Sequence, residues 1–149
     1  MNLPHPLHEF FRDLTALGGM SFYALMLLFT LLFRQYGIFF DLALGLLLML
    51  VVLLLIRTFY FKDRPLPQDY HTFLQKIDAS SFPSLHTARI FFLALYFSVL
   101  WNKIYLTIFL LSIASSVSYS RIYLQKHDWW DVLGGIVLAG IVLGVVRWV

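Results

Sequence analysis

The stretch IFFDLALGLLLMLVVLLLI, residues 38–56, holds a single charged residue, Asp41, and it decides the class of fold. Its length is close to the roughly 20 apolar residues that a helix needs to cross the hydrocarbon core of a bilayer. The composition agrees, because 60% of the 149 residues are hydrophobic and 13% are charged, whereas a soluble domain carries about 25% charged residues. The sequence therefore predicts an integral membrane protein and excludes an ordinary soluble domain.

Four more apolar runs accompany this stretch, and they cover residues 14–33, 90–101, 104–119 and 132–146. A backbone inside lipid must satisfy its own hydrogen bonds, which favours helices. We therefore predict an all-α, polytopic membrane bundle of about five transmembrane helices that forms a single domain over residues 1–149. The break at Asn102 and Lys103 is short enough to predict an antiparallel helical hairpin.

Features beside the apolar runs add detail. Residues 5–15 mix apolar and charged side chains, which predicts an amphipathic helix at the membrane interface. Gly140 and Gly144 are spaced for a close helix–helix contact of the fifth span. The net charge of +3 is too small to indicate a nucleic-acid partner. The tryptophans fall at predicted span ends, as expected of rings at the headgroup level, and they are Trp101, Trp129, Trp130 and Trp148.

Most ionisable residues gather in two polar connections, residues 57–89 and 120–131, which lie on the same side of the membrane if the chain crosses it five times. They carry three clusters. Arg57 and Arg64 form the first, seven residues apart, and would share one face of a helix if that helix continues to Pro65. Two planar guanidinium groups suit a phosphate. The alternative is a pair of arginines that snorkel at the end of a span.

The second cluster is SSFPSLHT, residues 80–87, directly before the third span. Serines and a proline at a helix start supply caps and free N–H groups, so an anion can bind there with His86 beside it. The alternative is plain helix capping with an interfacial histidine. Arg89 shares the helical face of His86 and either joins this cluster or pairs with an acid.

The third cluster is the most specific of the three and contains Ser120, Arg121, His127 and Asp131. His127 and Asp131 are four residues apart, which is one helical turn. An aspartate in that position accepts the proton of one imidazole nitrogen and leaves the other nitrogen free for nucleophilic attack. The alternative is a helix cap, formed by Asp128 or Asp131, with a bystander histidine.

In order and spacing these clusters resemble the three motifs of the type 2 phosphatidic acid phosphatase family, membrane lipid phosphatases related to vanadium haloperoxidases. The first family motif is Lys, six residues and Arg-Pro, where this chain has Arg57 and Arg64-Pro65. The second is Pro-Ser-Gly-His, where this chain has Pro83-Ser84-Leu85-His86. The third is Ser-Arg, five residues, His, three residues and Asp, which the chain matches in full. The short, five-span layout resembles that of the small bacterial and archaeal members, among them undecaprenyl pyrophosphate phosphatases.

The resemblance implies a role for each matched residue. His127 would attack phosphorus to form a phosphohistidine, Asp131 would orient its ring, and His86 would protonate the leaving lipid oxygen and then activate water. Arginines would supply the charge stabilisation, so neither a metal nor another cofactor is implied. The implied phosphate ligands are Arg57, Arg64, Ser84, Leu85 through its N–H, and Arg121, with Lys62 as a candidate ligand for a second phosphate.

The resemblance also implies a substrate, a membrane lipid phosphate or diphosphate, with polyprenyl diphosphate as first choice and phosphatidylglycerol phosphate, phosphatidate or lipid A as alternatives. It implies an active site on the extracytoplasmic side of the cell membrane, whereas a literal count of basic residues places the polar connections in the cytoplasm. Two other hypotheses stay open: a membrane protein that binds haem or a metal through His86 and His127, and an inactive relative that only binds phospholipid. The oligomeric state is left open.

Overall fold

The computed structural model describes residues 6–66 and 69–149, which form helices joined by turns and loops, without a strand. The helices are α1 (Pro6–Leu14), η1 (Thr15–Gly18), α2 (Met20–Leu32), α3 (Tyr36–Phe59), α4 (Phe73–Ala79), α5 (Leu85–Trp101), α6 (Ile104–Tyr123) and α7 (Trp129–Trp148). The all-α class predicted from the sequence is confirmed. The predicted amphipathic helix corresponds to α1, and His5, with which that prediction begins, lies outside the described residues.

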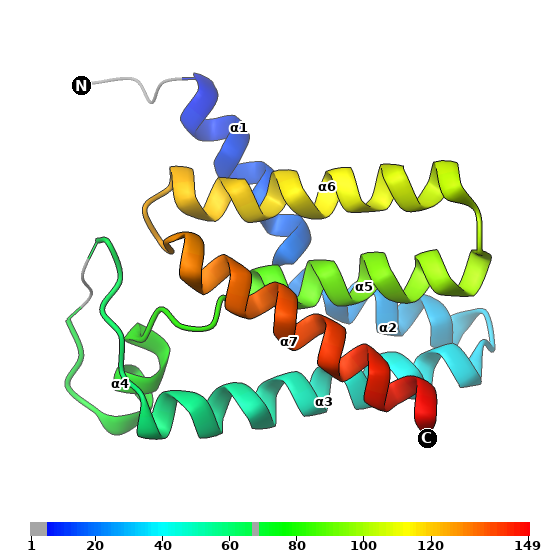
Figure 1. Cartoon of the computed structure of the whole chain (residues 1–149), viewed down its shortest axis with the longest axis horizontal. Coiled ribbons are helices and arrows are strands. Elements are labelled where there is room, and N and C mark those ends of the chain that lie inside the picture. Colours follow the sequence, from blue (N-terminus) through cyan, green and yellow to red (C-terminus); the bar gives the residue numbers. More distant parts are fainter. Residues whose placement is uncertain (1–5, 67–68) are drawn as a thin grey trace.

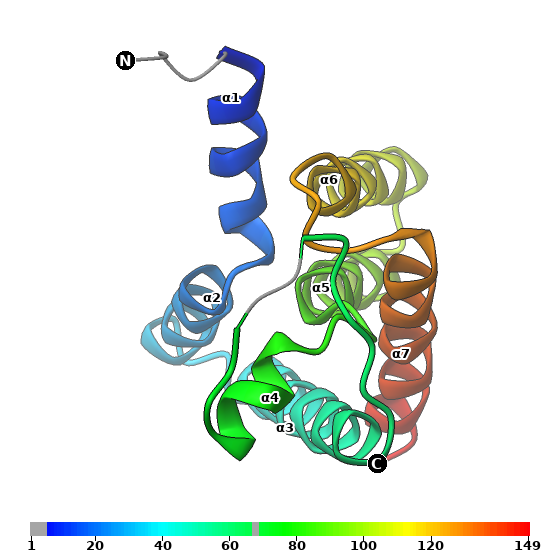
Figure 2. The ribbon, with the colours of Figure 1, turned by 90° about the vertical axis from the view of Figure 1, so that its left-hand side faces the viewer.

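Helix α5 forms the centre of the bundle, and α3, α6 and α7 pack around it (Figure 2). All residues from 87 to 94 are buried, which covers more than two turns and hence every face of the helix. Asn102 ends α5 in the left-handed conformation, with φ of 48°, and the chain returns at once as α6. The two helices therefore form the predicted antiparallel hairpin (Figure 1).

Three helices of the described chain, α3, α6 and α7, are long and apolar enough to cross a membrane. The pair formed by residues 6–18 and α2 adds a fourth if this bent pair is one span. Helix α5, with 17 residues, is apolar but shorter. Each of the five predicted runs therefore corresponds to a helix, although their lengths differ from the expected ones.

The first predicted span is not one straight helix. Its first part forms the 3₁₀ segment η1 and the rest forms α2, which has 13 residues, and residues 6–18 are bent by 43° relative to α2. The bend lies at two glycines. Gly19 has extended backbone, and Gly18 packs so closely on α5 that an added Cβ would lie 3.0 Å from the carbonyl oxygen of His86. The bend thus places η1 directly on the first turn of α5.

The helix contact predicted at Gly140 and Gly144 is wrong, since both glycines are exposed and a Cβ at either position would meet nothing within 4 Å. Helix α7 instead approaches α5 through Gly135, where an added Cβ would lie 2.6 Å from the carbonyl oxygen of Ser84. The buried face of α7 follows helical spacing and contains Asp131, Gly135, Leu138, Val142 and Val146. The spacing of two small residues alone could not identify this face.

The two polar connections lie at the same end of the bundle, as predicted (Figure 1). Trp129 and Trp130 begin α7 at this end, whereas Trp101 and Trp148 lie at the last residues of α5 and α7 at the other end. All four indole rings are exposed, which fits rings that lie at the two membrane interfaces. The polar residues of the chain are thus concentrated beside one interface.

Candidate active site

The polar connections contact each other where α3 and α6 end and α5 and α7 begin. The N–H of Ser84 donates to the carbonyl oxygen of Asp131 over 2.9 Å, and the N–H of Leu66 donates to the carbonyl oxygen of Gln125 over 3.2 Å. These bonds join backbone to backbone. The relative position of the two connections is therefore fixed by the fold and does not depend on flexible side chains.

His127 lies in the loop between α6 and α7, and a tight turn places it. The N–H groups of Lys126 and His127 both donate to the carbonyl oxygen of Arg121, over 3.0 and 3.2 Å. Gln125 adopts the left-handed conformation within this turn, with φ of 53°. The five-residue spacing between Arg121 and His127 is thus the length of a turn that brings the histidine back to the end of α6.

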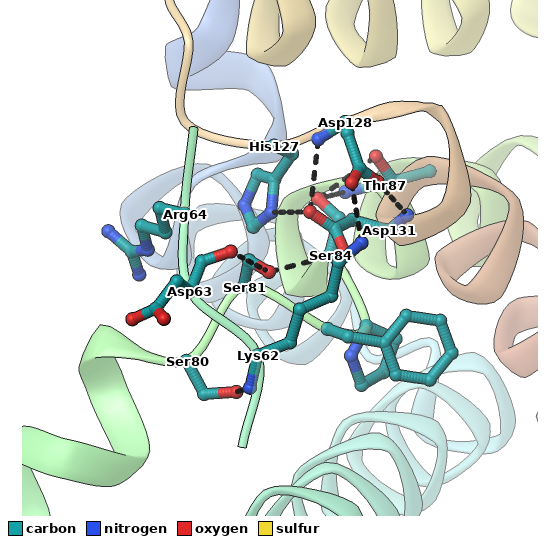
Figure 3. A network of polar contacts seen from close by, with 12 residues as sticks. Lys62, Asp63, Arg64, Ser80, Ser81, Ser84, Thr87, His127, Asp128 and Asp131 are labelled. Atoms are coloured by element: carbon teal, nitrogen blue, oxygen red, sulfur yellow. Dashed lines mark hydrogen bonds and ion pairs between the residues drawn. The ribbon is translucent and has the colours of Figure 1, made fainter. Parts of the chain in front are cut away.

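The imidazole of His127 is buried and faces Asp131 (Figure 3). Its Nδ1 lies 3.5 Å from Oδ2 of Asp131, and the two side chains are 3% and 0% exposed. This distance is long for a hydrogen bond, but catalytic hydrogen bonds often shorten only when substrate binds. A proton on Nδ1 that faces the carboxylate leaves the lone pair of Nε2 available for attack.

Asp131 also caps the helix on which it lies. Asp128 is the N-cap of α7, and the carboxylate of each aspartate accepts a hydrogen bond from the N–H of the other over 3.0 Å. Ser81 donates its hydroxyl proton to Oδ1 of Asp131 over 3.3 Å. Asp131 therefore takes part in the capping box of α7 and also faces His127, so the two alternatives considered in the sequence do not exclude each other.

Lys62 holds both aspartates together (Figure 3). Its Nζ donates to Oδ2 of Asp128 over 2.6 Å and to Oδ1 of Asp131 over 2.8 Å. Burial lowers the pKa of Lys62, but the hydrogen bonds to the two carboxylates outweigh it, so the pKa is raised and the lysine stays charged. The sequence suggested this lysine for a second phosphate. In the structure its charge is already matched by two acids.

The surroundings of His127 favour the neutral imidazole. Burial lowers its pKa, the hydrogen bond with Asp131 opposes this shift, and the charges of Arg121 and Arg64 add to it. The net effect is a pKa below the ordinary value for histidine. His127 is therefore unprotonated at neutral pH, which is the form that a nucleophile needs.

His86 lies in the first turn of α5 and is half-buried. The charges of Arg121, Arg89 and Arg64 all act on it, as does that of His127. The two histidines thus share one end of the bundle and one group of cations. Sequence spacing alone could not establish this, because 40 residues and the whole α5–α6 hairpin separate them.

Ser84 is the N-cap of α5 and is fully buried. Its Oγ accepts hydrogen bonds from the N–H of Thr87 over 3.5 Å and from the Thr87 hydroxyl over 3.1 Å. Leu85, at the position of the motif glycine, packs its side chain against the hydrophobic core. Its N–H lies in the first helical turn, where N–H groups have no partner within the helix. The larger residue is accommodated by the core.

The buried guanidinium of Arg57 is bound by the chain itself. Its Nε donates to the carbonyl oxygen of Phe82 over 3.3 Å, Nη1 to that of Ile77 over 3.0 Å and Nη2 to that of Pro83 over 3.0 Å. These carbonyls belong to α4 and to the loop directly before Ser84. Arg57 therefore ties the end of α3 to the segment that carries the second motif.

The prediction that Arg57 and Arg64 share a helical face is wrong, since α3 ends at Phe59 and Tyr60 has extended backbone. A residue before proline disfavours the helical conformation, which keeps the chain extended as it approaches Pro65. The half-buried Arg64 donates from Nη2 to the carbonyl oxygen of Asp78 over 2.6 Å. Its charge acts on His127, and Figure 3 shows its guanidinium beside that imidazole.

Arg121 and Arg89 are both buried beside His86. Arg121 donates from Nη1 to the hydroxyl of Thr15 over 3.0 Å, and Arg89 donates from Nη1 to the sulfur of Met20 over 3.4 Å. Neither forms an ion pair with a carboxylate of the described residues. The sequence left open whether Arg89 pairs with an acid, and it does not. Its position three residues after His86 was the only signal for it.

The donor set of the site suits an anion. Within residues 6–66 and 69–149, no group of three or more His, Asp and Glu side chains is placed to hold a metal ion. The groups around the two histidines are arginines, whose charge would oppose that of a metal. This composition is typical of a site that binds phosphate.

A family model described as the PAP2 superfamily matches residues 43–149, a region that contains all three motifs. The chain belongs to the PAP2 superfamily. The family resemblance inferred from the motifs is thereby confirmed.

Two relatives and one solved structure are similar to this PAP2 chain. Lipid A 4'-phosphatase of Bacteroides thetaiotaomicron is 39% identical over 59 residues, which are 40% of this chain and 26% of the relative. The putative undecaprenyl-diphosphatase YbjG of Escherichia coli is 37% identical over 81 residues, which are 54% of this chain and 40% of the relative. The chain thus spans less than half the length of either relative. The crystal structure of Aquifex aeolicus LpxE matches with a TM-score of 0.77 at 28% identity, over 99% of this chain and 90% of that one.

Proposed function

We propose that this PAP2 protein is an integral-membrane phosphatase that hydrolyses a lipid phosphate or diphosphate through a phosphohistidine intermediate. The observation that carries the proposal is the meeting of two histidines, one orienting aspartate and several arginines at one end of a bundle of apolar helices. Phosphoryl transfer needs an aligned nucleophile and compensation of the charge on the phosphoryl oxygens. The site offers both.

In the first step, Nε2 of neutral His127 attacks phosphorus in line with the bond to the lipid oxygen. The P–N bond forms as the P–O bond breaks, and His86, protonated, donates its proton to the departing oxygen. Asp131 keeps the proton of His127 on Nδ1 and stabilises the positive charge that develops on the ring. Lys62 and Asp128 hold Asp131 in place for this role.

In the second step, water attacks the phosphohistidine. His86, now neutral, accepts a proton from the water, and the P–N bond to His127 breaks as the new P–O bond forms. Inorganic phosphate leaves, and both histidines return to their initial protonation states. No step requires a metal, because arginines compensate the phosphoryl charge.

The other matched residues fall into two groups. Arg64, Arg121 and the N–H of Leu85 bind the phosphoryl oxygens directly. Arg57 and Ser84 position the helix start, Arg57 through its three bonds to the preceding loop and Ser84 as the N-cap. This division follows from the bonds that Arg57 and Ser84 already make within the chain.

Polyprenyl diphosphate is our first choice of substrate, and the protein is placed in the cell membrane with its active site on the extracytoplasmic side. The choice is supported by the putative function named for YbjG, while the name of the Bacteroides relative supports lipid A as an alternative. The exposed apolar surface of the helices lets a long hydrocarbon chain stay within the bilayer.

The test measures phosphate release by the purified protein in detergent, with chelator present. The panel comprises polyprenyl diphosphate, phosphatidylglycerol phosphate, phosphatidate and lipid A. We expect His127→Ala to abolish release, and we expect the exposed histidine variant His71→Ala to match the wild type. Release that survives His127→Ala removes the nucleophile assignment. Release that stops on chelation favours the metal hypothesis.

The covalent intermediate is tested separately. His86→Ala lacks the base for the second step, so it should accumulate acid-labile, base-stable phosphate on the protein when supplied with a phosphate ester that has a good leaving group. The double variant His86→Ala, His127→Ala should carry none. Equal labelling of the two variants contradicts the phosphohistidine.

A further inference from the structure

Arg89 is a buried cation that has no counter-ion among the residues that the structure describes. Its side chain is 5% exposed, its Nη1 contacts only the weakly accepting sulfur of Met20, and its Nε has no hydrogen-bond partner. Burying an unpaired charge is expensive, and an arginine within a membrane-protein helix normally faces a partner or a functional cavity. The stability of the fold therefore does not by itself explain why a charged residue occupies position 89.

Its neighbourhood adds to that cost. Arg121 is also buried, its Nε also lacks a partner, and its charge and that of Arg89 act on each other. Two buried guanidinium groups with no acid between them repel each other. Their proximity is stabilised when an anion lies between them.

The position of Arg89 relative to the reaction gives the identity of that anion. His127 attacks phosphorus from one side, and His86 protonates the leaving oxygen on the other side. Arg89 follows His86 by one turn on the same face of α5, so it lies farther along on the leaving-group side. Arg64, in contrast, lies beside His127. Arg64 and Arg121 act on both histidines, and Arg89 adds a further cation on the His86 side.

An apolar cavity of about 230 Å³ lies along the part of α5 that follows Arg89. It is lined by residues of η1, α2, α5 and α6, including Leu17, Met26 and Ile90. Ile90 directly follows Arg89, and Met20, which contacts Arg89, begins α2. The cavity therefore offers room for part of a hydrocarbon chain on the stretch of α5 that follows Arg89.

We propose that Arg89 forms a second anion subsite on the leaving-group side of His86, which binds the inner phosphate of a lipid diphosphate, while the neighbouring Arg121 binds the outer phosphoryl group. The inference rests on the proposed function and specifies its substrate class. The inner phosphate leaves as part of the lipid monophosphate product. Arg89 compensates the negative charge that the inner phosphate carries before and after His86 protonates the departing oxygen.

The experiment compares two substrates with the same chain, farnesyl diphosphate and farnesyl phosphate, in detergent. We expect Arg89→Gln to lower kcat/KM for the diphosphate at least about 30-fold more than for the monophosphate, equivalent to about 2 kcal/mol. Arg89→Lys should recover part of this difference, since it keeps the charge. Arg147→Gln, at the opposite end of α7, is the matched control and should leave the ratio unchanged. An equal loss on both substrates in Arg89→Gln overturns the subsite.

A second measurement needs no variant. In the wild type, methylenediphosphonate should inhibit farnesyl phosphate hydrolysis competitively and at least tenfold more strongly than methylphosphonate. Equal inhibition by the two phosphonates overturns the subsite even if the Arg89 variants fail to fold. Phosphate release from neither substrate by the wild type would overturn the proposed function itself. Release from both, with an unchanged ratio in Arg89→Gln, would overturn only the subsite.

Discussion

Gly135→Ala tests whether the close approach of α7 to α5 sets the position of Asp131. The added methyl group would lie 2.6 Å from the carbonyl oxygen of Ser84, 2.9 Å from Cβ of Thr87 and 3.2 Å from the backbone nitrogen of Ala88. These atoms belong to the backbone or lie next to it, so no side-chain rotation removes the clash. Ordinary contact begins near 3.4 Å, and α7 must therefore move by roughly 0.8 Å, the difference between 3.4 and 2.6 Å.

Activity should respond to this movement more than stability does. Asp131 lies one turn before Gly135 and moves with the helix, which changes its distance to His127. A displacement near 1 Å can lower turnover about 100-fold, and we expect a loss of kcat of that order. Overpacking destabilises by about 1–3 kcal/mol, but the higher helix propensity of alanine returns up to about 1 kcal/mol. The net loss of stability should be small.

The assay measures kcat for phosphate release together with thermal unfolding in detergent. Gly140→Ala is the matched control, because it makes the same change on the same helix where a Cβ meets nothing within 4 Å. It should keep the wild-type kcat and equal or exceed the wild-type stability. If Gly135→Ala turns over as fast as Gly140→Ala, the contact with α5 does not position Asp131 and the reasoning is refuted.

Three more predictions concern the polar groups of the site. Lys62→Met leaves two carboxylates without their cation. We therefore expect kcat to fall about 10- to 100-fold for monophosphate and diphosphate lipids alike. A rise in KM that is confined to diphosphate lipids would instead assign Lys62 to a second phosphate. Arg57→Lys removes most of the three bonds to loop carbonyls and should lower the free energy of unfolding, measured by denaturant titration in detergent, by about 3 kcal/mol. A raised KM with unchanged stability would favour a direct contact of Arg57 with phosphate. Because burial lowers the pKa of His127, the acid limb of the kcat/KM profile should lie below about pH 6.5. Asp131→Asn removes a hydrogen bond that raises this pKa, so the acid limb should move to still lower pH while kcat falls, and a shift to higher pH would contradict the assignment.

Hydropathy located the helices well but not their breaks. Residues 14–33 carry no charge and read as one span, yet the chain bends between η1 and α2. The bend depends on Gly18 packing against His86, a contact with a residue far along the chain. The same holds for the glycines of α7, since the burial of Asp131 selects the face on which Gly135 lies. Contacts between residues that are far apart in the chain cannot be predicted from local sequence patterns.

The motifs identified the chemistry of the site but not the partner of each cation. Arg57 was expected to bind phosphate because it is the first residue of the first motif, and Lys62, between Arg57 and Arg64, was a candidate ligand for a second phosphate. Their actual partners are carbonyls and carboxylates that lie 20 or more residues away in the chain. Arg89, outside every motif, is buried like Arg121, and neither of them pairs with an acid of the described residues. Which cation is available to a substrate is decided only when the fold brings these groups together.

The ion pairs that Lys62 forms with Asp128 and Asp131 explain why it matters which cations remain available to a substrate. Asp131 must be buried to orient His127, and a buried carboxylate needs a cation. Were that cation an arginine from the group around His86, the acid would lower the positive potential where the phosphoryl group binds. Lys62 takes this role from the far side of Asp131 and also engages Asp128. The side-chain hydrogen bonds to Asp131 thus come from Lys62 and Ser81, and neither Arg89 nor Arg121 is bound by the acid.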